Sequence, residues 1–95
     1  MSKEARLKAG FLLRQVQGGE TLAMPDSKPM PSIGSHCHEL RVQDGSESWR
    51  FIYRMDPGAI ILVDVFSKKT QKTPKRVIDT CKARLKGFDA ERKGR

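Results

Sequence analysis

Apolar residues recur at helical spacing near the start of the chain. Ser2 can accept a hydrogen bond from a free backbone N–H as an N-cap, and Glu4 suits the positive end of the helix dipole. The residues that share one face in this pattern are Ala5, Ala9, Leu12, Leu13 and Val16. Gly18 and Gly19 favour a helix end. The pattern predicts a first helix between Ser2 and Gly18.

An irregular segment and then three strand-like runs follow. Residues 21–35 contain three prolines, which favours a loop that wraps the core. His38–Val42 alternates polar and apolar residues, Trp49–Arg54 is rich in aromatic residues, and Ala59–Phe66 is almost continuously apolar. Asp56-Pro57-Gly58 is a strong turn signal between the last two runs. We therefore predict a three-stranded antiparallel meander.

A second helical pattern closes the chain. Thr73 suits an N-cap, and Pro74 suits the first residue of a helix. One apolar face collects Val77, Ile78, Cys81, Leu85 and Phe88. Gly87 lies near the predicted helix end, and we expect residues 89–95 to form a frayed tail. The predicted fold class is α+β: a small antiparallel sheet flanked by an N-terminal and a C-terminal helix, in a single domain over residues 1–95.

The charge of the chain is concentrated in its last third. The chain has 95 residues and a formal net charge of +8. Residues 1–67 contain 8 Lys and Arg against 8 Asp and Glu, whereas residues 68–95 contain 11 against 3. Such a field attracts a polyanion, and nucleic acid is the commonest polyanion in a cell. The alternative is a solvated basic tail without a specific partner.

Hydropathy and cysteine usage narrow the class of protein. No apolar run approaches the ~20 residues that a membrane-crossing helix needs, and the N-terminus lacks an apolar signal segment. We therefore expect a cytoplasmic protein with no membrane partner. Cys37 and Cys81 are expected to be reduced thiols.

The triplet His36-Cys37-His38 combines residue types that ligate metals. A closed zinc site needs four ligands, however, and the only other thiol, Cys81, falls on the apolar face of the last helix. We predict neither a metal nor a cofactor, and no local signature marks Cys37 as a nucleophile. His38 is the more interesting titratable group, because it lies close to Arg41 and imidazole can move protons near neutral pH.

Residues 66–76 form the most informative stretch, with five cations between a strand-like run and a helix start. Lys75 and Arg76 occupy the first turn of the predicted helix, where cations are unfavourable by roughly 0.3–1 kcal/mol each at exposed sites. Free backbone N–H groups there, beside Lys68, Lys69 and Lys72 in a solvated loop, make a ready phosphate site. The alternative is that these cations are surface charges that serve solubility.

Arginines also lie within the predicted strands, at Arg41, Arg50 and Arg54. An arginine there must face solvent, a carboxylate or a ligand, because burial without a partner is costly. Tyr53 follows Arg50 by three positions and could donate its hydroxyl or stack on a base. The alternative places Tyr53 in the core and pairs an arginine with Glu39, Glu47 or Asp64.

Four motifs together resemble a known family. They are Lys28-Pro-Met-Pro-Ser-Ile-Gly34, Glu39-Leu-Arg41, Arg50-Phe-Ile-Tyr53 and Phe66-Ser-Lys-Lys-Thr-Gln-Lys-Thr-Pro74. In this order and spacing they resemble the phage-derived HigB-like branch of the RelE/ParE toxin superfamily, over about residues 5–88. The resemblance implies a compact α+β fold like that of microbial RNases. It also implies the toxin of a type II toxin–antitoxin pair, usually one that cleaves mRNA on the translating ribosome.

The resemblance also implies the chemistry of the site. In such endoribonucleases a ribose 2′-OH attacks the adjacent phosphate, while basic residues hold the phosphate and stabilise its developing charge. By this pattern Arg50 and Lys69 would hold the scissile phosphate, and Lys68 and Lys72 would hold the flanking backbone.

The remaining roles follow from the same pattern. Arg41 would be a second phosphate clamp, Tyr53 a stacking or orienting group, and His38 an optional proton carrier. Lys75 and Arg76 join the predicted phosphate-binding set from the helix-start argument rather than from the resemblance.

Members of this family usually begin with a strand and a helix before the segment that matches residues 5–17, and this chain starts without them. An uncovered sheet edge exposes unpaired backbone groups. We therefore expect a homodimer, or a complex in which a segment of a helix-turn-helix antitoxin completes the sheet. Two other functions stay open: non-enzymatic, ParE-like inhibition of DNA gyrase, and an inactive, truncated RNA-binding relic.

Overall fold

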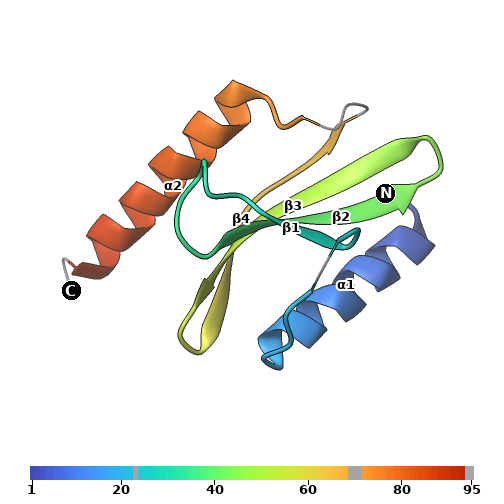
Figure 1. The fold of residues 1–95 in the computed structure, drawn as a ribbon, viewed down its shortest axis with the longest axis horizontal. Helices are drawn as coiled ribbons and strands as arrows, with labels where there is room; N and C mark the ends of the chain where they lie inside the picture. Colours follow the sequence, from blue (N-terminus) through green and yellow to red (C-terminus); the bar gives the residue numbers. More distant parts are fainter. Residues whose placement is uncertain (23, 69–71, 94–95) are drawn as a thin grey trace.

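The computed structural model describes residues 1–22, 24–68 and 72–93, and these residues form two helices and a four-stranded sheet (Figure 1). The sheet lies between the two helices, so that each helix covers one of its faces. The elements are α1 (Lys3–Gln17), β1 (Ser27–Pro29), β2 (Cys37–Asp44), β3 (Glu47–Asp56), β4 (Ala59–Lys68) and α2 (Lys75–Lys93).

The sheet is antiparallel throughout, with the strands in chain order from β1 to β4. Gly45 and Gly58 close the two hairpins with positive φ values of 61° and 74°, a conformation that glycine adopts without strain. The register places Arg41 opposite Arg50 and His38 opposite Tyr53. Because successive side chains of a strand point to opposite faces, these two pairs lie on different faces of the sheet.

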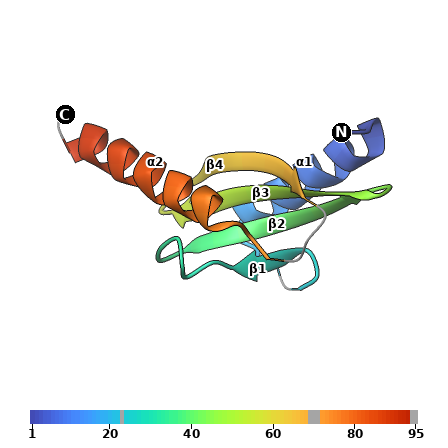
Figure 2. The ribbon, with the colours of Figure 1, turned by 90° about the horizontal axis from the view of Figure 1, so that it is seen from above.

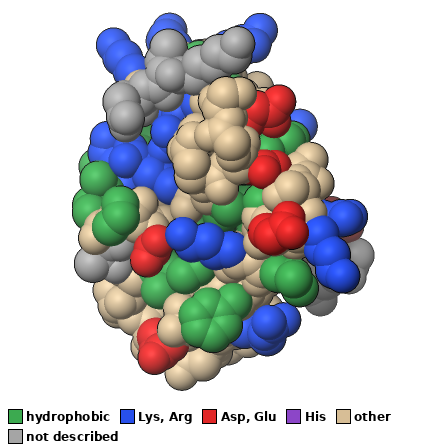
Figure 3. Space-filling view, turned by 90° about the vertical axis from the view of Figure 1, so that its right-hand side faces the viewer, with side chains coloured by type: hydrophobic (Ala, Val, Ile, Leu, Met, Phe, Trp, Pro, Cys, Tyr) green, Lys and Arg blue, Asp and Glu red, His purple; other side chains and the backbone are tan. Residues whose placement is uncertain are grey.

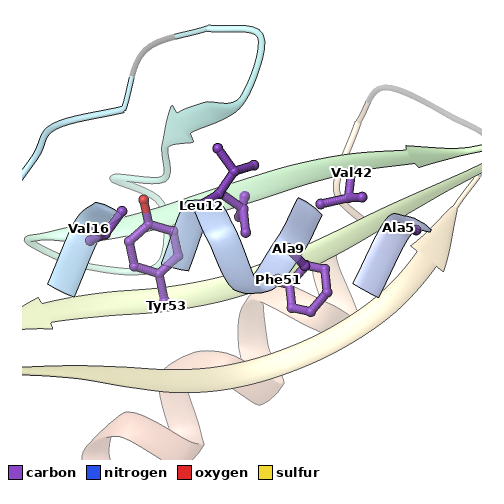
Figure 4. Close-up of a cluster of buried hydrophobic side chains, with 8 residues drawn as sticks. Ala5, Ala9, Leu12, Val16, Val42, Phe51 and Tyr53 are labelled. Carbon is purple, nitrogen blue, oxygen red and sulfur yellow. The ribbon is translucent and has the colours of Figure 1, made fainter. Parts of the chain in front are cut away.

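One face of the sheet packs against α1 in a dry apolar core (Figure 4). The helical residues Ala5, Ala9, Leu12 and Val16 meet Leu40 and Val42 of β2 and Phe51 and Tyr53 of β3. The Ser2 hydroxyl accepts the Ala5 N–H at 3.1 Å, and Asp44 accepts the Ser2 N–H at 2.7 Å. The predicted first helix and its N-cap are therefore confirmed.

The other face of the sheet packs against α2. Cys37 and Ile52 of the sheet meet Cys81 and Leu85 of α2, together with Met30 and Ile33 from the segment between β1 and β2. The C-terminal half of α2 projects past the ends of the strands (Figure 2). This face therefore carries a smaller apolar cluster than the face that α1 covers.

The α+β class and the flanking helices are as predicted, but the sheet has a further strand. Residues 27–29 lie in the segment that the three prolines suggested would be irregular, and they pair with residues 38–40 of β2. Prolines do not prevent this pairing, because β1 is a short edge strand and Pro29 is its last residue.

The last helix runs further than the sequence pattern predicted. Gly87 does not end α2, which continues through residues 89–93, so the expectation of a frayed tail is wrong over that range. Arg54 donates to both carboxylate oxygens of Asp89 at 2.8 and 2.9 Å, and Arg92 donates to Asp56 at 3.3 Å. These ion pairs hold the last turns of the helix to the end of β3.

None of the helices in the described ranges is long and apolar enough to span a membrane.

Candidate phosphate-binding site

A buried carboxylate organises the half of the α2-covered face next to the start of α2. Glu39 on β2 has no solvent exposure. Its Oε1 accepts from Arg50 Nη1 at 3.1 Å and from Arg41 Nε at 3.4 Å. Its Oε2 accepts from the Thr73 hydroxyl at 2.6 Å and lies 3.5 Å from Lys68 Nζ. Glu39 thus ties three strands to Thr73, two residues before the start of α2.

The resulting cluster holds more positive than negative charge. Three cations, Arg41, Arg50 and Lys68, share the single carboxylate of Glu39, which leaves an excess of two positive charges. The side chains of Arg50 and Lys68 are only 4% and 6% exposed. Burial lowers the pKa of both groups below their usual values, although Glu39 opposes that shift. An anion at this position would neutralise charge that the protein itself leaves unbalanced.

Glu39 itself stays ionised. Burial alone would raise its pKa, but the hydrogen bond from Thr73 and the positive charges of Lys68 and Arg50 outweigh that effect. The pKa of Glu39 therefore lies below its ordinary value. An ionised carboxylate with four donors around it is a fixed counter-ion rather than a proton acceptor for a reaction.

Two guanidinium groups of this cluster border a hollow of about 230 Å³ beside β2 and β3. Arg50 Nε is buried and has no hydrogen-bond partner among the described residues. In the same part of the chain, the only hydrogen bond that the Arg41 side chain makes is through Nε, so both of its Nη groups are available. Gln43 and Ser48 add an amide and a hydroxyl to the lining, and Asp26 adds a carboxylate, which lies 3.9 Å from Lys8. The hollow can hold a phosphate group within reach of both arginines.

The cations at the start of α2 lie at the surface. Lys72, Lys75 and Arg76 are exposed, and Lys75 lies 4.0 Å from Asp79. The face seen in Figure 3 shows Lys and Arg side chains gathered over its upper part. Lys69, expected to hold the scissile phosphate, lies outside the described residues. The structure thus supports a surface with exposed cations above a buried positive cluster.

Lys68 differs from its predicted setting. It was expected in a solvated loop, but it is the last residue of β4. Its side chain is buried and donates to the Thr73 hydroxyl at 2.9 Å. Within the described ranges the Thr73 hydroxyl accepts no N–H of α2; it accepts from Lys68 and donates to Glu39 instead. The Pro74 carbonyl accepts the N–H groups of Val77 and Ile78 in the first turn of the helix.

Tyr53 and His38 lie on the face of the sheet opposite to Arg41 and Arg50. Tyr53 is 1% exposed and lies in the α1-side core, where its hydroxyl and that of Ser27 are 2.9 Å apart. Burial raises the pKa of Tyr53. His38 stacks on the Tyr53 ring, with centroids 5.4 Å apart. The three-residue spacing from Arg50 to Tyr53 places them on opposite faces of a strand, so the expected base-stacking position of Tyr53 is wrong.

The structure agrees with the alternative hypothesis for the strand arginines, in which they form ion pairs and Tyr53 lies in the core. Arg41 and Arg50 pair with Glu39, and Tyr53 lies in the core. Arg54 instead pairs with Asp56 and Asp89. Glu39 and Thr73 were not predicted as site residues. The sequence could have indicated Glu39, because residues 39 and 41 of one strand share a face and a glutamate there can pair with Arg41.

The His36-Cys37-His38 triplet forms no metal centre in the described ranges, where no three ligand-type side chains converge. Cys37 and Cys81 are free thiols and both are buried. Burial raises the pKa of Cys37, and it raises that of Cys81 to about 11. Neither thiol is therefore activated as a nucleophile.

These features describe a small basic α+β protein with a buried excess of positive charge on one face of its sheet. A family model described as "Phage derived protein Gp49-like (DUF891)" matches residues 1–86. The chain therefore belongs to this phage-derived, toxin-like family, which confirms the predicted origin at that level. No curated protein and no solved structure matches the chain.

Proposed function

We propose that this protein binds RNA through the Arg41–Arg50 hollow and acts as the toxin of a type II toxin–antitoxin pair that cuts mRNA on the translating ribosome. The observation that carries the proposal is the buried excess of positive charge around Glu39, with an unpartnered Arg50 Nε beside a phosphate-sized hollow. The family membership supports the toxin class. The HigB-like branch of the RelE/ParE superfamily is the finer assignment that the sequence motifs favour.

In this proposal a backbone phosphate sits against the Nη groups of Arg41 and the Nε of Arg50. The 2′-OH of the preceding ribose attacks the phosphorus, the bond to the next 5′ oxygen breaks, and a cyclic phosphate and a 5′-hydroxyl result. The arginines stabilise the additional charge that develops on the phosphate oxygens, which is an electrostatic rather than an acid–base contribution. The exposed cations Lys72, Lys75 and Arg76 hold the neighbouring backbone.

One observation favours a second function, RNA binding without cleavage. The side chains best suited to proton transfer near neutral pH do not line the hollow: His38 lies on the other face of the sheet, and Glu39 is buried and fully engaged. A protein that only binds mRNA on the ribosome would stop translation and leave the mRNA intact. Inhibition of DNA gyrase remains the third candidate.

Expression of the chain followed by primer extension on a reporter mRNA distinguishes these functions. We expect growth arrest and new 5′ ends inside the coding region, which disappear when initiation is blocked. Arrest with intact mRNA and stalled ribosomes would establish binding without cleavage. Arrest with accumulated gyrase–DNA breaks would establish the gyrase function and overturn the proposal.

A pair of variants tests the site itself. Arg41→Ala removes an arginine that lines the hollow, and Arg14→Ala removes an exposed arginine from α1. For single-stranded RNA, loss of one phosphate contact should reduce the slope of log K against log salt by about 0.7. We expect that reduction, and loss of cleavage, for Arg41→Ala only. Equal effects of the two variants would mean that RNA binds through nonspecific surface charge rather than in the hollow.

The partners that the sequence analysis predicted, a helix-turn-helix antitoxin and a homodimer, remain proposals. β4 is an outer strand of the sheet, and its residues Leu62 and Val65 are 50% and 39% exposed. An added strand at this edge would pair with backbone groups of β4 that no strand of the described sheet meets. Light scattering over a dilution series, with and without a co-expressed neighbouring reading frame, measures both associations.

A further inference from the structure

A second and larger hollow lies away from the phosphate site. It has a volume of about 910 Å³ and runs between the second half of α2, residues 33–37 and the end of β3. Its floor is apolar, formed by the buried side chains of Ile33, Cys37 and Leu85. α2 projects beyond the strands here (Figure 2), which leaves this flank of the helix open. We refer to this hollow as the α2 groove.

One wall of the α2 groove is cationic. Lys82, Lys86 and Lys93 line it from α2, and all three are exposed. Their spacing of four and seven residues places them along one flank of the helix. Within the described ranges none of the three forms an ion pair, whereas Lys75 and Arg84 of the same helix do. Lys93 also faces Asp89, whose pKa its positive charge helps to lower, so the cations of the groove without a carboxylate partner in the described ranges are Lys82 and Lys86.

The acidic residues of the groove are already engaged. Arg54 donates to Asp56 at 2.7 and 2.9 Å and to Asp89 at 2.8 and 2.9 Å. These hydrogen bonds lower the pKa of both carboxyls. The opposite wall carries Ser35 and His36 and no acidic side chain. The unbalanced positive charge of the groove is therefore that of Lys82 and Lys86.

The hydrogen bonds of Arg54 with Asp56 and Asp89 also hold the two sides of the groove together. The Arg54 guanidinium bridges the end of β3 and α2, and the Phe88 ring lies 6.0 Å from Arg54 and 5.4 Å from Arg92. This contact fixes the distance between the helix and the strand end that bound the groove. The helix and strand end that bound the groove are therefore held together before a ligand binds, which lowers the ordering cost of binding.

The chemistry of the lining selects the kind of ligand. Single-stranded RNA is held by stacking on aromatic rings as well as by charge, and no Phe, Tyr or Trp lines the groove. An aliphatic floor beside a row of lysines instead matches a helix with apolar residues on one side and carboxylates on its flank. A second copy of this chain offers no such helix, because α1 and α2 are both net basic.

We propose that the α2 groove binds an acidic amphipathic helix of a partner protein, with its apolar residues on Ile33 and Leu85 and its carboxylates on Lys82 and Lys86. This proposal stands on a surface separate from the Arg41–Arg50 hollow and does not depend on the RNA function.

Three labelled probes test it: a 16-residue helical peptide with a leucine face flanked by glutamates, the same peptide with lysines in place of the glutamates, and a 12-nucleotide oligouridine. Binding is measured by fluorescence anisotropy at physiological salt, and the site is mapped by amide chemical shifts. We expect the acidic peptide alone to shift residues 33–37 and 82–93. Lack of binding at 1 mM peptide, equal binding of the basic peptide, or oligouridine shifts in the groove would overturn the proposal.

Charge reversal supplies the matched control. The double variant Lys82→Glu/Lys86→Glu should weaken acidic-peptide binding at least tenfold. Lys75→Glu/Arg76→Glu makes the same charge change on the same helix outside the groove and should weaken it much less. Equal losses would mean that net charge rather than the groove binds the peptide. All four positions are exposed, so thermal melts should show that each variant remains folded.

Discussion

The same strands build two faces of very different character. Toward α1, the strands present Leu40, Val42, Phe51 and Tyr53 to an apolar helix face. Toward α2, the alternate positions present Glu39, Arg41, Arg50 and Lys68, and apolar packing is left to the other half of that face. The first face gains stability from burial of apolar area, whereas the second buries charges whose desolvation offsets much of their attraction.

This difference indicates which face is kept for function. A buried ion pair contributes little net stability compared with apolar residues of similar size, and an excess of buried positive charge contributes still less. The α1 face buries an apolar cluster and does not carry this desolvation penalty. Stability alone therefore accounts for the α1 face, while the α2 face is better explained by a ligand that supplies negative charge.

The largest expected effect comes from removing the shared carboxylate. Glu39→Ala leaves Arg50 and Lys68 buried without their counter-ion, and breaking a buried pair in this way costs about 3–5 kcal/mol. We expect a loss of that size in the free energy of unfolding, measured by urea denaturation. A loss below about 1 kcal/mol would mean that the cations relax into solvent and that the cluster is not truly buried.

A cavity on the α1 face should have a comparable but smaller effect on stability. Leu12→Ala removes a core side chain and should cost about 3 kcal/mol. Leu7→Ala on the same helix is the control, because Leu7 is 61% exposed and its loss should stay within about 0.5 kcal/mol. Neither variant should change the affinity for RNA. A parallel loss of affinity would show that the two faces are coupled.

Acid should act mainly on the α2 face. The folded-state pKa of Glu39 lies below its unfolded value, so its contribution to stability is present above the unfolded pKa of about 4.3 and is lost as the pH falls through the folded value. Unfolding free energies between pH 7 and pH 3 should therefore fall more steeply for the wild type than for Glu39→Gln. Parallel curves would assign the acid sensitivity to other carboxylates, such as Asp56 and Asp89.

The smallest effect tests the hydroxyl of the α1-side core. Tyr53→Phe leaves the buried Ser27 hydroxyl without its partner and should cost about 1 kcal/mol in thermal or urea unfolding. RNA binding and cleavage should be unchanged, because Tyr53 faces away from the arginines. Loss of cleavage in a stable Tyr53→Phe variant would show that the Tyr53 hydroxyl takes part in catalysis after all.

The sequence by itself determined the local elements of this protein. Helical periodicity from Ala5 to Val16 and the Ser2 cap predicted α1, and the Asp56-Pro57-Gly58 signal predicted the second hairpin, because these features depend on neighbours a few residues apart. Charge composition likewise indicated a polyanion partner, since it requires no coordinates. The short strand β1 escaped prediction because its pairing with β2 is a tertiary contact.

Only the tertiary structure decided which cations form the site. Lys68 and Arg50 come together because residues far apart in the chain converge on Glu39, and the burial of that carboxylate turns three ordinary cations into a cluster with unbalanced charge. The length of α2 depends similarly on the contact of Asp89 with Arg54 across the fold. Periodicity reports which residues share a face of one element, whereas ion pairs between elements depend on how those faces are packed together.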